Sequence, residues 1–156
     1  MQKFSILLLA LMAVATPLHA EVVAEQSVER EIVKKSADGT VKLERVPAVK
    51  VAPGNEVIYS IRFQNKGSDP AADIIMVMPV PKEVSYVEGS ASGISSNVTF
   101  SADGGKTYLN RGRLTVKEEG VERAATNNEI THIKWVMAEA LAAEERGSVS
   151  YRGVVK

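Results

Sequence analysis

The sequence contains no cysteine among its 156 residues. This absence excludes a disulfide framework, a zinc site built from thiolates and a cysteine nucleophile. Net charge is also missing, because 19 lysine and arginine residues balance 19 aspartate and glutamate residues. Aromatic residues make up only 5% of the chain and are not interleaved with basic ones. Composition therefore gives no support for binding to nucleic acid or anionic lipid, and the length suits one domain with a modest core.

Long hydrophobic runs are absent except near the N-terminus, where "FSILLLALMAVA" follows Lys3. With "TPLHA" after it, this stretch is typical of a secretory signal peptide. We predict that residues 1–20 are removed by cleavage after Ala20; cleavage after Ala15 is the alternative. Nothing further along approaches the roughly 20 apolar residues of a membrane span. The sequence thus predicts an exported protein, and the lack of cysteine favours a bacterial periplasm or cell surface.

Most of the remaining chain alternates between apolar and polar residues, as β-strands do. The residues predicted to face inward are Val57, Tyr59, Ile61 and Phe63 in "VIYSIRFQN", Ile133, Trp135 and Met137 in "ITHIKWVM", and Val149, Tyr151 and Val155 in "SVSYRGVV". "DIIMVM" is apolar on both faces, as expected of a central strand or one covered on both sides. Turns such as "APGN" and "NKGSDP" separate these runs. Many short strands with turns between them predict a β-sandwich.

Two segments are predicted to differ from these strands. "MAEALAAEER" at 137–146 has a helix-forming composition, so one or two helical turns are expected there. Residues 21–46 are predicted to form a charged hairpin that belongs to the sandwich, with a two-residue turn at Asp38-Gly39. The hairpin's charge is interpreted as that of a solvated edge strand that avoids pairing with neighbours. A charged docking strip is the alternative interpretation.

The order of motifs in "PGNEVIYSIRFQNKGSDPAADIIMVMPVPKEVSYVEGSA" carries a family resemblance. It runs through a Pro-Gly turn, a Tyr-bearing strand, an Asn-x-Gly turn, a strand, a proline pair, and a Tyr-Val strand leading to Gly-Ser. This order resembles the conserved-repeat domain of bacterial envelope and surface proteins, a domain of unknown function numbered eleven. "ITHIKW" and "GSVSYRGVV" are similar to its late strand with a buried tryptophan and to its last strand. The resemblance implies an immunoglobulin-like antiparallel β-sandwich of about seven to nine strands, over residues 47–156.

The stretch "FSADGGKTY" at 100–108 is the one most like a functional signature. Its pattern Ser101-x-Asp103-x-Gly105-x-Thr107-Tyr108 resembles the Asp-box, a hairpin turn known from sialidase propellers. One copy cannot build a propeller, and one carboxylate is too few for a calcium loop. We predict a structural turn in which the aspartate accepts backbone hydrogen bonds, glycine adopts a positive φ and the tyrosine packs beneath.

Candidates for metal binding and catalysis are few. His132 is the single histidine of the predicted mature chain, because His19 lies in the signal peptide. Strand alternation directs His132 away from the tryptophan face, which argues against a catalytic triad. Met76 and Met78 share a face, and with Met137 and His132 they could form a periplasmic copper site, although packing is the preferred interpretation.

Adjacent carboxylates occur at Glu118-Glu119 and Glu144-Glu145, and such pairs can serve in acid–base chemistry. Here they lie in charged, loop-like segments and are interpreted as solvated. No catalytic, cofactor or metal residue is therefore assigned.

These observations predict a non-catalytic exported envelope protein, a single immunoglobulin-like module that acts as a structural or protein- or glycan-binding domain. The alternative is a small periplasmic ligand or copper carrier on the same sandwich. The expected partner is a protein or glycan of the cell envelope, with no nucleic acid and no membrane span in the mature chain. Self-association is also considered, because "SVSYRGVV" is almost uncharged and would offer backbone groups if it lay at an edge.

Overall fold

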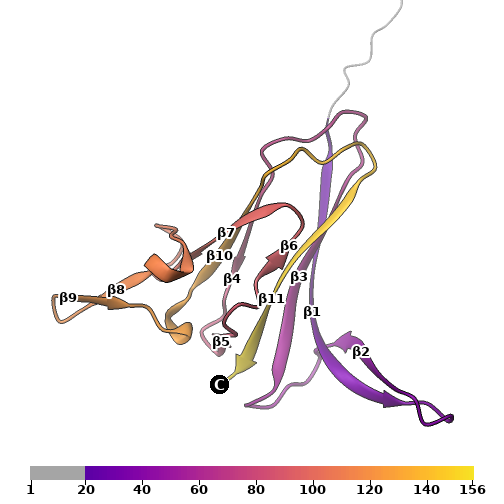
Figure 1. Ribbon diagram of the computed structural model, residues 1–156, viewed down its shortest axis with the longest axis horizontal. Helices are drawn as coiled ribbons and strands as arrows, with labels where there is room; N and C mark the ends of the chain where they lie inside the picture. Colours follow the sequence, from indigo (N-terminus) through magenta and orange to yellow (C-terminus); the bar gives the residue numbers. More distant parts are fainter. Residues whose placement is uncertain (1–19) are drawn as a thin grey trace, which may run out of the picture.

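The computed structural model describes residues 20–156, and the predicted signal peptide, except Ala20, lies outside the described residues together with His19. The fold consists of two antiparallel sheets and a separate hairpin (Figure 1). The long sheet contains β1 (Val22–Lys35), β2 (Val41–Pro47), β3 (Glu56–Asn65), β5 (Val84–Tyr86), β6 (Ser92–Gly93) and β11 (Arg146–Val155). The short sheet contains β4 (Ile75–Pro79), β7 (Ser96–Ser101) and β10 (His132–Met137), and the hairpin contains β8 (Thr115–Glu118) and β9 (Val121–Ala124). This arrangement confirms the predicted all-β, antiparallel sandwich of the immunoglobulin-like type.

The strand order places the C-terminal strand inside the long sheet. The order is β2-β1-β3-β11-β5, with β6 also beside β11, and the order in the short sheet is β4-β10-β7. β11 pairs with β3 along one side and with β5 and β6 along the other. The idea that the last strand lies at an open edge is therefore wrong.

The core forms where the inward faces of the two sheets meet, and it confirms the predicted alternation. Ile133 and Trp135 on β10 and Tyr151 on β11 have no exposed surface. The ring of Tyr59 stacks on that of Tyr151 with centroids 4.9 Å apart. The Tyr151 hydroxyl donates a hydrogen bond of 2.8 Å to the carbonyl oxygen of Pro79, which joins the long sheet to the end of β4.

Residues 20–156 form eleven strands, more than the seven to nine predicted. β6 has only two residues, and the β8–β9 hairpin was not anticipated. Its turn residues, Glu119 and Gly120, have φ values of 50° and 86°. Positive φ at both positions is typical of a type I′ turn, but the usual sequence signal is Asn or Asp rather than Glu at the first position.

Residues 137–146 form no helix, contrary to the prediction. Met137 still belongs to β10, and Leu141 forms two backbone hydrogen bonds with Ala71, of 2.8 and 2.9 Å. The side-chain amide of the buried Asn65 donates a further bond of 3.0 Å to the Leu141 carbonyl. Burial of Leu141 and this pairing outweigh the local helix propensity. The helical segments of the described chain are two short 3₁₀ turns, Arg111–Arg113 and Asn127–Glu129.

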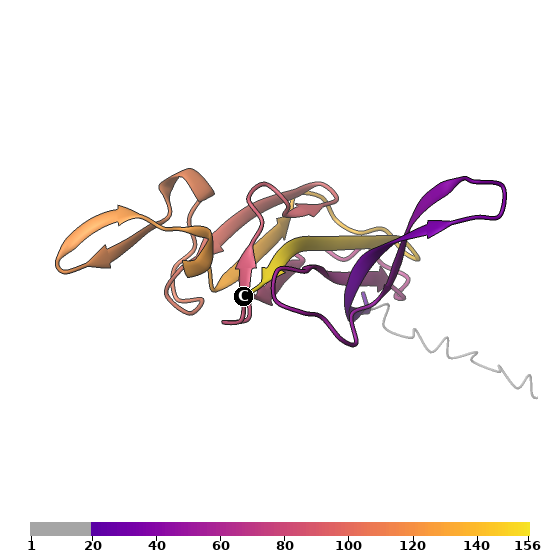
Figure 2. The same cartoon turned by 90° about the horizontal axis from the view of Figure 1, so that it is seen from below.

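The N-terminal hairpin covers nearly the predicted residues but is less enclosed than predicted. Residues 22–29 of β1 pair with β3, whereas residues 29–35 pair with β2 and leave the sheet. Gly39 has a φ of 86°, and Ser36 and Thr40 are bridged by a backbone hydrogen bond of 2.8 Å. The loop therefore has three residues between the bonded pair, not a two-residue turn. We call residues 29–47 the β1–β2 arm; Figure 2 shows this arm and the β8–β9 hairpin projecting from opposite ends of the molecule.

Candidate functional site

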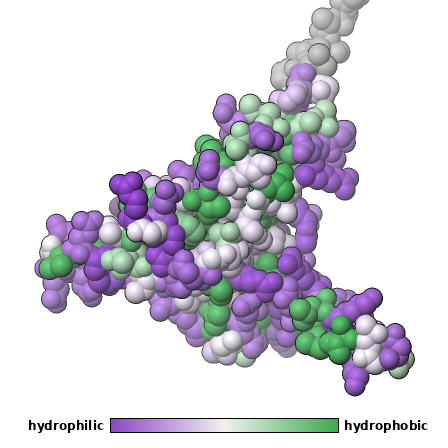
Figure 3. Space-filling model, in the orientation of Figure 1, coloured by the Kyte–Doolittle hydropathy of each residue, from purple (hydrophilic) through white to green (hydrophobic). Residues whose placement is uncertain are grey.

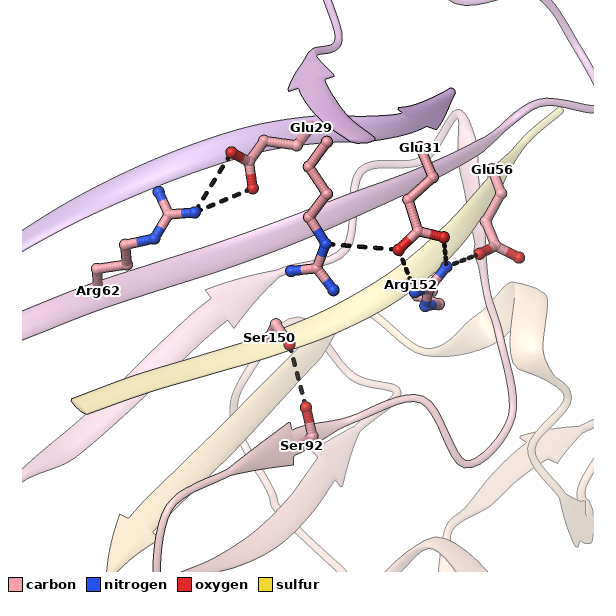
Figure 4. Close-up of polar contacts among 8 residues, drawn as sticks. Glu29, Glu31, Glu56, Arg62, Ser92, Ser150 and Arg152 are labelled. Carbon is pink, nitrogen blue, oxygen red and sulfur yellow. Dashed lines mark hydrogen bonds and ion pairs between the residues drawn. The ribbon is translucent and has the colours of Figure 1, made fainter. Parts of the chain in front are cut away.

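The outer face of the long sheet carries a row of serines. Cross-strand pairing aligns Ser27 on β1 with Ser60 on β3, Ser60 with Ser150 on β11, and Ser150 with Ser92 on β6. The hydroxyls of Ser92 and Ser150 lie 3.1 Å apart (Figure 4). Ser60 is buried, Ser27 and Ser150 are half-buried and Ser92 is exposed, so the row gives this part of the sheet a strip of short polar side chains.

Next to the serine row, ion pairs cross between strands. The Arg62 guanidinium donates hydrogen bonds of 3.2 and 3.3 Å to the Glu29 carboxylate and a longer one of 3.5 Å to the Ser27 hydroxyl. Glu29 of β1 is therefore paired across the sheet rather than only solvated.

A second network fixes the base of the β1–β2 arm. Arg152 on β11 donates two hydrogen bonds to Glu31 on β1, of 2.8 and 3.0 Å, and one of 2.6 Å to Glu56 (Figure 4). Arg45 on β2 adds a contact of 3.4 Å to Glu31. Hydrogen bonding from Arg152 lowers the pKa of Glu31, although partial burial opposes that shift. A two-point contact between guanidinium and carboxylate is directional, so the network sets how the arm leaves the sheet.

Beyond this network, the same face of the arm becomes apolar. Pairing of Val33 with Leu43 and of Lys35 with Val41 places the three apolar side chains on the face that also carries Glu31. Val33, Val41 and Leu43 are 69%, 59% and 68% exposed. Figure 3 shows hydrophobic surface on this arm. A two-stranded hairpin without a second layer is only marginally stable in water, and here no other element of residues 20–156 covers it.

The opposite end of the outer face is hollowed and mostly basic. A hollow of about 650 Å³ lies over β1, β3 and β11, and the charged side chains that line it are Arg62, Lys66, Arg146 and Glu25. Arg62 is already paired with Glu29, so Lys66 and Arg146 against Glu25 leave a net positive charge that suits an anionic group.

At the far end of the molecule, Arg123 holds the β8–β9 hairpin. Its guanidinium donates to Glu129 at 2.8 and 2.9 Å and to Glu118 at 2.6 Å. Bonds from Arg123 and Thr126 lower the pKa of Glu129 to about 2. Glu118, one of the adjacent carboxylates noted in the sequence, is therefore part of an ion pair.

The Asp103 segment forms the predicted structural turn. The carboxylate accepts hydrogen bonds from the backbone amides of Lys106 and Thr107, at 3.0 Å, and from the hydroxyls of Ser101 and Thr107, at 2.7 Å. These bonds, those from Thr107 above all, hold the pKa of Asp103 well below its ordinary value. Gly104 and Gly105 adopt φ values of 79° and 84°. The carboxylate of Asp103 is therefore occupied by hydrogen bonds within its own turn.

The residues considered for copper do not come together, because His132 lies on the opposite face of the short sheet from Met76, Met78 and Met137. Pairing places Met76 opposite Trp135 and Met78 opposite Ile133, so both methionines share the inward face of the short sheet. His132 alternates with Ile133 and lies on the outward face, where its Nδ1 is 3.2 Å from the Thr131 hydroxyl. Within residues 20–156, no three His, Asp or Glu side chains are grouped to hold a metal ion.

The other adjacent carboxylates also make structural contacts. Glu144, at a φ of 62°, accepts a hydrogen bond of 3.1 Å from the Gln64 side chain. Glu145 accepts one of 2.8 Å from the backbone amide of Ala142. Both therefore stabilise the turn that leads into β11.

Sequence reasoning missed the serine row, the Arg152 network and the exposed arm face. The signal for the arm was present, because "IVKK" and "VKLERV" alternate around Gly39, but the sequence does not show that the paired strands leave the sheet. Compared with known proteins, the chain matches no family model, no curated protein and no solved structure. In residues 20–156, no helix has the length and apolar character needed to cross a membrane.

Proposed function

We propose that the protein is a non-catalytic, exported binding module of the cell envelope, and that its β1–β2 arm contacts a partner protein. The exposed apolar face of Val33, Val41 and Leu43 is the observation that supports this function. Apolar contacts at the centre of a surface, with charged groups around them, are typical of protein–protein interfaces. Glu31 and Arg45 lie at the base of this face, and Lys35 and Asp38 lie near its tip.

The Arg152 network supports the same proposal. It connects the arm to the centre of the long sheet, so the apolar face is presented in a defined direction rather than on a freely moving loop. A surface that is already ordered loses less conformational entropy when a partner binds. Export and the family resemblance remain part of the proposal and rest on the sequence alone.

Site-specific photocrosslinking in the producing cells tests this function. A photoreactive amino acid at Leu43 should give a discrete covalent adduct with one protein. The matched control is the neighbouring residue Lys42, which lies on the opposite face of the arm and should give none. Excess unlabelled protein should suppress the adduct, whereas an excess of the Leu43→Glu variant should not. Equal adducts from both positions, or none from Leu43, would contradict the proposal.

The basic hollow favours a glycan partner as a second candidate. Arg146 and Lys66 could bind the carboxylates of an acidic glycan, and the outward serines could bind its hydroxyls. Binding of an oligosaccharide of uronic acids, followed by calorimetry, should then be lost in Arg146→Glu and kept in Leu43→Glu.

A copper carrier has less support, because His132 and the pair Met76 and Met78 lie on opposite faces of the short sheet. Calorimetry with Cu(I) and Cu(II) tests it directly. Stoichiometric, submicromolar binding that disappears in the Met76→Leu/Met78→Leu variant would restore this alternative.

A further inference from the structure

No element of residues 20–156 packs beneath part of the inner face of the long sheet. Ala24 on β1 pairs with Phe63, a core residue, so Val22, Ala24, Gln26 and Val28 all face inward. All four are nevertheless exposed, and Val22 and Val28 are each 37% exposed. β1 therefore overhangs the short sheet.

β4 is the strand of the short sheet that lies nearest this overhang. At the other edge, Phe100 on β7 packs against Tyr86 on β5, with ring centroids 5.4 Å apart. β5 and β1 lie on opposite sides of β3 and β11 in the long sheet, and β7 and β4 are the two edges of the short sheet. Hence β4 lies on the β1 side of the short sheet. We call the inward face of β1 residues 22–28 and the open edge of β4 the β1–β4 ledge.

The pairing of β4 with β10 determines which of its backbone groups point out of the sheet. The Met137 amide donates to the Ile74 carbonyl at 3.0 Å, and the Val80 amide donates to the Thr131 carbonyl at 2.8 Å. Antiparallel bonding alternates, so the even-numbered residues of this stretch bond to β10 and the odd-numbered ones face away.

The open edge therefore presents the amide and carbonyl groups of Ile75 and Val77. Neither residue forms a backbone hydrogen bond on this side with any of residues 20–156. Pro79 is the next residue whose backbone faces this open edge. It has no N–H group, and its carbonyl oxygen accepts a hydrogen bond from the Tyr151 hydroxyl. An added strand could therefore bond to two amide donors and two carbonyl acceptors of β4, those of Ile75 and Val77.

The sequence of β4 is that of an internal strand, although it lies at an edge. "IMVMP" contains no charge, and Ile75 and Val77 are 56% and 42% exposed. Natural edge strands usually carry charged residues that prevent the addition of another strand. Even the charged neighbour on β10 is directed away, because the Lys134 ammonium lies 4.1 Å from the centre of the Tyr108 ring.

We propose that one extended strand of a partner protein adds to β4 and fills the β1–β4 ledge. Its backbone bonds to Ile75 and Val77, and its alternate side chains pack against Val22, Ala24 and Val28. The inward residues of β1 in the ledge, Val22, Ala24, Gln26 and Val28, are uncharged, so the inward side chains of the added strand are apolar. β4 has five residues, which sets the length of the paired segment to about five.

The geometry selects a single strand rather than a second copy paired edge to edge. Neighbouring strands lie about 4.8 Å apart, so the position next to β4 is directly under β1. A second copy joined through its own β4 would bring its long sheet into the layer that β1 already occupies. A single added strand brings no second sheet with it, so it does not clash with β1.

The probe for this proposal is an uncharged heptapeptide of alternating valine and threonine, blocked at both ends, added to the isotopically labelled exported chain. Saturable NMR shifts are expected at the amides of Ile75 and Val77 and at the methyl groups of Val22 and Val28. Hydrogen exchange at the two amides should also slow. A peptide N-methylated at alternate residues, on the edge that faces β4, should not bind.

Two neighbouring residues give a matched pair of variants. Val22 and Val23 are both 37% exposed, but Val22 faces the ledge and Val23 faces outward. Val22→Glu should abolish peptide binding, and Val23→Glu should preserve it. Val77→Pro removes one open donor without touching the bonds to β10, so it should weaken binding as well.

The arm variant Leu43→Glu should leave peptide binding unchanged, which separates this test from that of the proposed function. Absence of binding, or equal binding to Val22→Glu and Val23→Glu, would overturn the proposal. Protection of Ile75 and Val77 on concentrating the protein alone would also overturn it, because the occupant would then be a second copy.

Discussion

Replacing Trp135 with alanine tests the packing between the two sheets. The side chain has no exposed surface and lies between Ile133 and Met137 on the inward face of β10. Truncation of a fully buried tryptophan lowers the free energy of unfolding by about 3–5 kcal/mol, because the transfer energy is lost and a cavity is left. Small domains are stabilised by only about 5–15 kcal/mol, so this variant should be partly or wholly unfolded.

A second substitution at Trp135 separates packing from hydrogen bonding. The indole Nε1 is buried and has no hydrogen-bond partner in the described chain. A buried donor without a partner is unfavourable by about 1–3 kcal/mol. Trp135→Phe removes that donor while keeping an aromatic ring, so it should destabilise the protein clearly less than Trp135→Ala.

Urea unfolding followed by far-ultraviolet circular dichroism measures both variants, since the fluorescent residue itself is removed. The control is Val33→Ala, a truncation on the exposed arm, which should change stability by less than about 0.5 kcal/mol. Two results would contradict the assignment of Trp135 to the buried face of β10. One is wild-type fluorescence like that of a water-exposed indole, and the other is unfolding of Trp135→Ala at the same urea concentration as the wild type.

Three further predictions concern the signal peptide and two single contacts. Mass spectrometry of the exported protein should find Glu21 at the N-terminus, and an intact Met1 would refute the signal peptide. Tyr151→Phe, which loses the hydrogen bond to Pro79, should lower the free energy of unfolding by about 1 kcal/mol in urea titrations. The Glu129 pKa lies at about 2, below its ordinary value of 4.5, so its stabilising contact is complete above pH 4.5 and is lost as the pH falls toward 2. Hydrogen exchange of the β8–β9 amides should therefore accelerate over that range in wild type, and a Glu129→Gln variant should show fast exchange already at neutral pH.

The features predicted correctly from the sequence are those set by interactions between residues that lie close together along the chain. Alternation placed Phe63 and Trp135 in the core and directed His132 to the opposite face, because side-chain direction in a strand has a period of two. The Asp103 turn was also predictable, since a short carboxylate next to two glycines can satisfy its own backbone. Both predictions depend on residues within a few positions of each other.

The predictions that failed depend on partners far along the chain. The helix expected at 137–146 is absent because Leu141 pairs with Ala71, which lies 70 residues earlier. The Arg152 network joins β11 to Glu31 across more than a hundred residues, so no sequence window contains it. Neither contact leaves a signal in the composition of its own segment.

The local pattern of β4 correctly predicted a strand, but the strand lies at a position in the sheet that the pattern did not predict. Its sequence is apolar on both faces and predicts a central strand or one covered on both sides, yet the structure places it at an edge with Ile75 and Val77 exposed. An apolar, uncharged edge favours unwanted pairing, so it is a disadvantage for a protein that stays alone. The inward face of β1 has the same mismatch, since Val22, Ala24 and Val28 alternate like core residues but cover nothing. These two incomplete surfaces adjoin each other. The edge of β4 lacks a hydrogen-bonded neighbour, and the inward face of β1 lacks a layer packed against it. The same single added strand completes both.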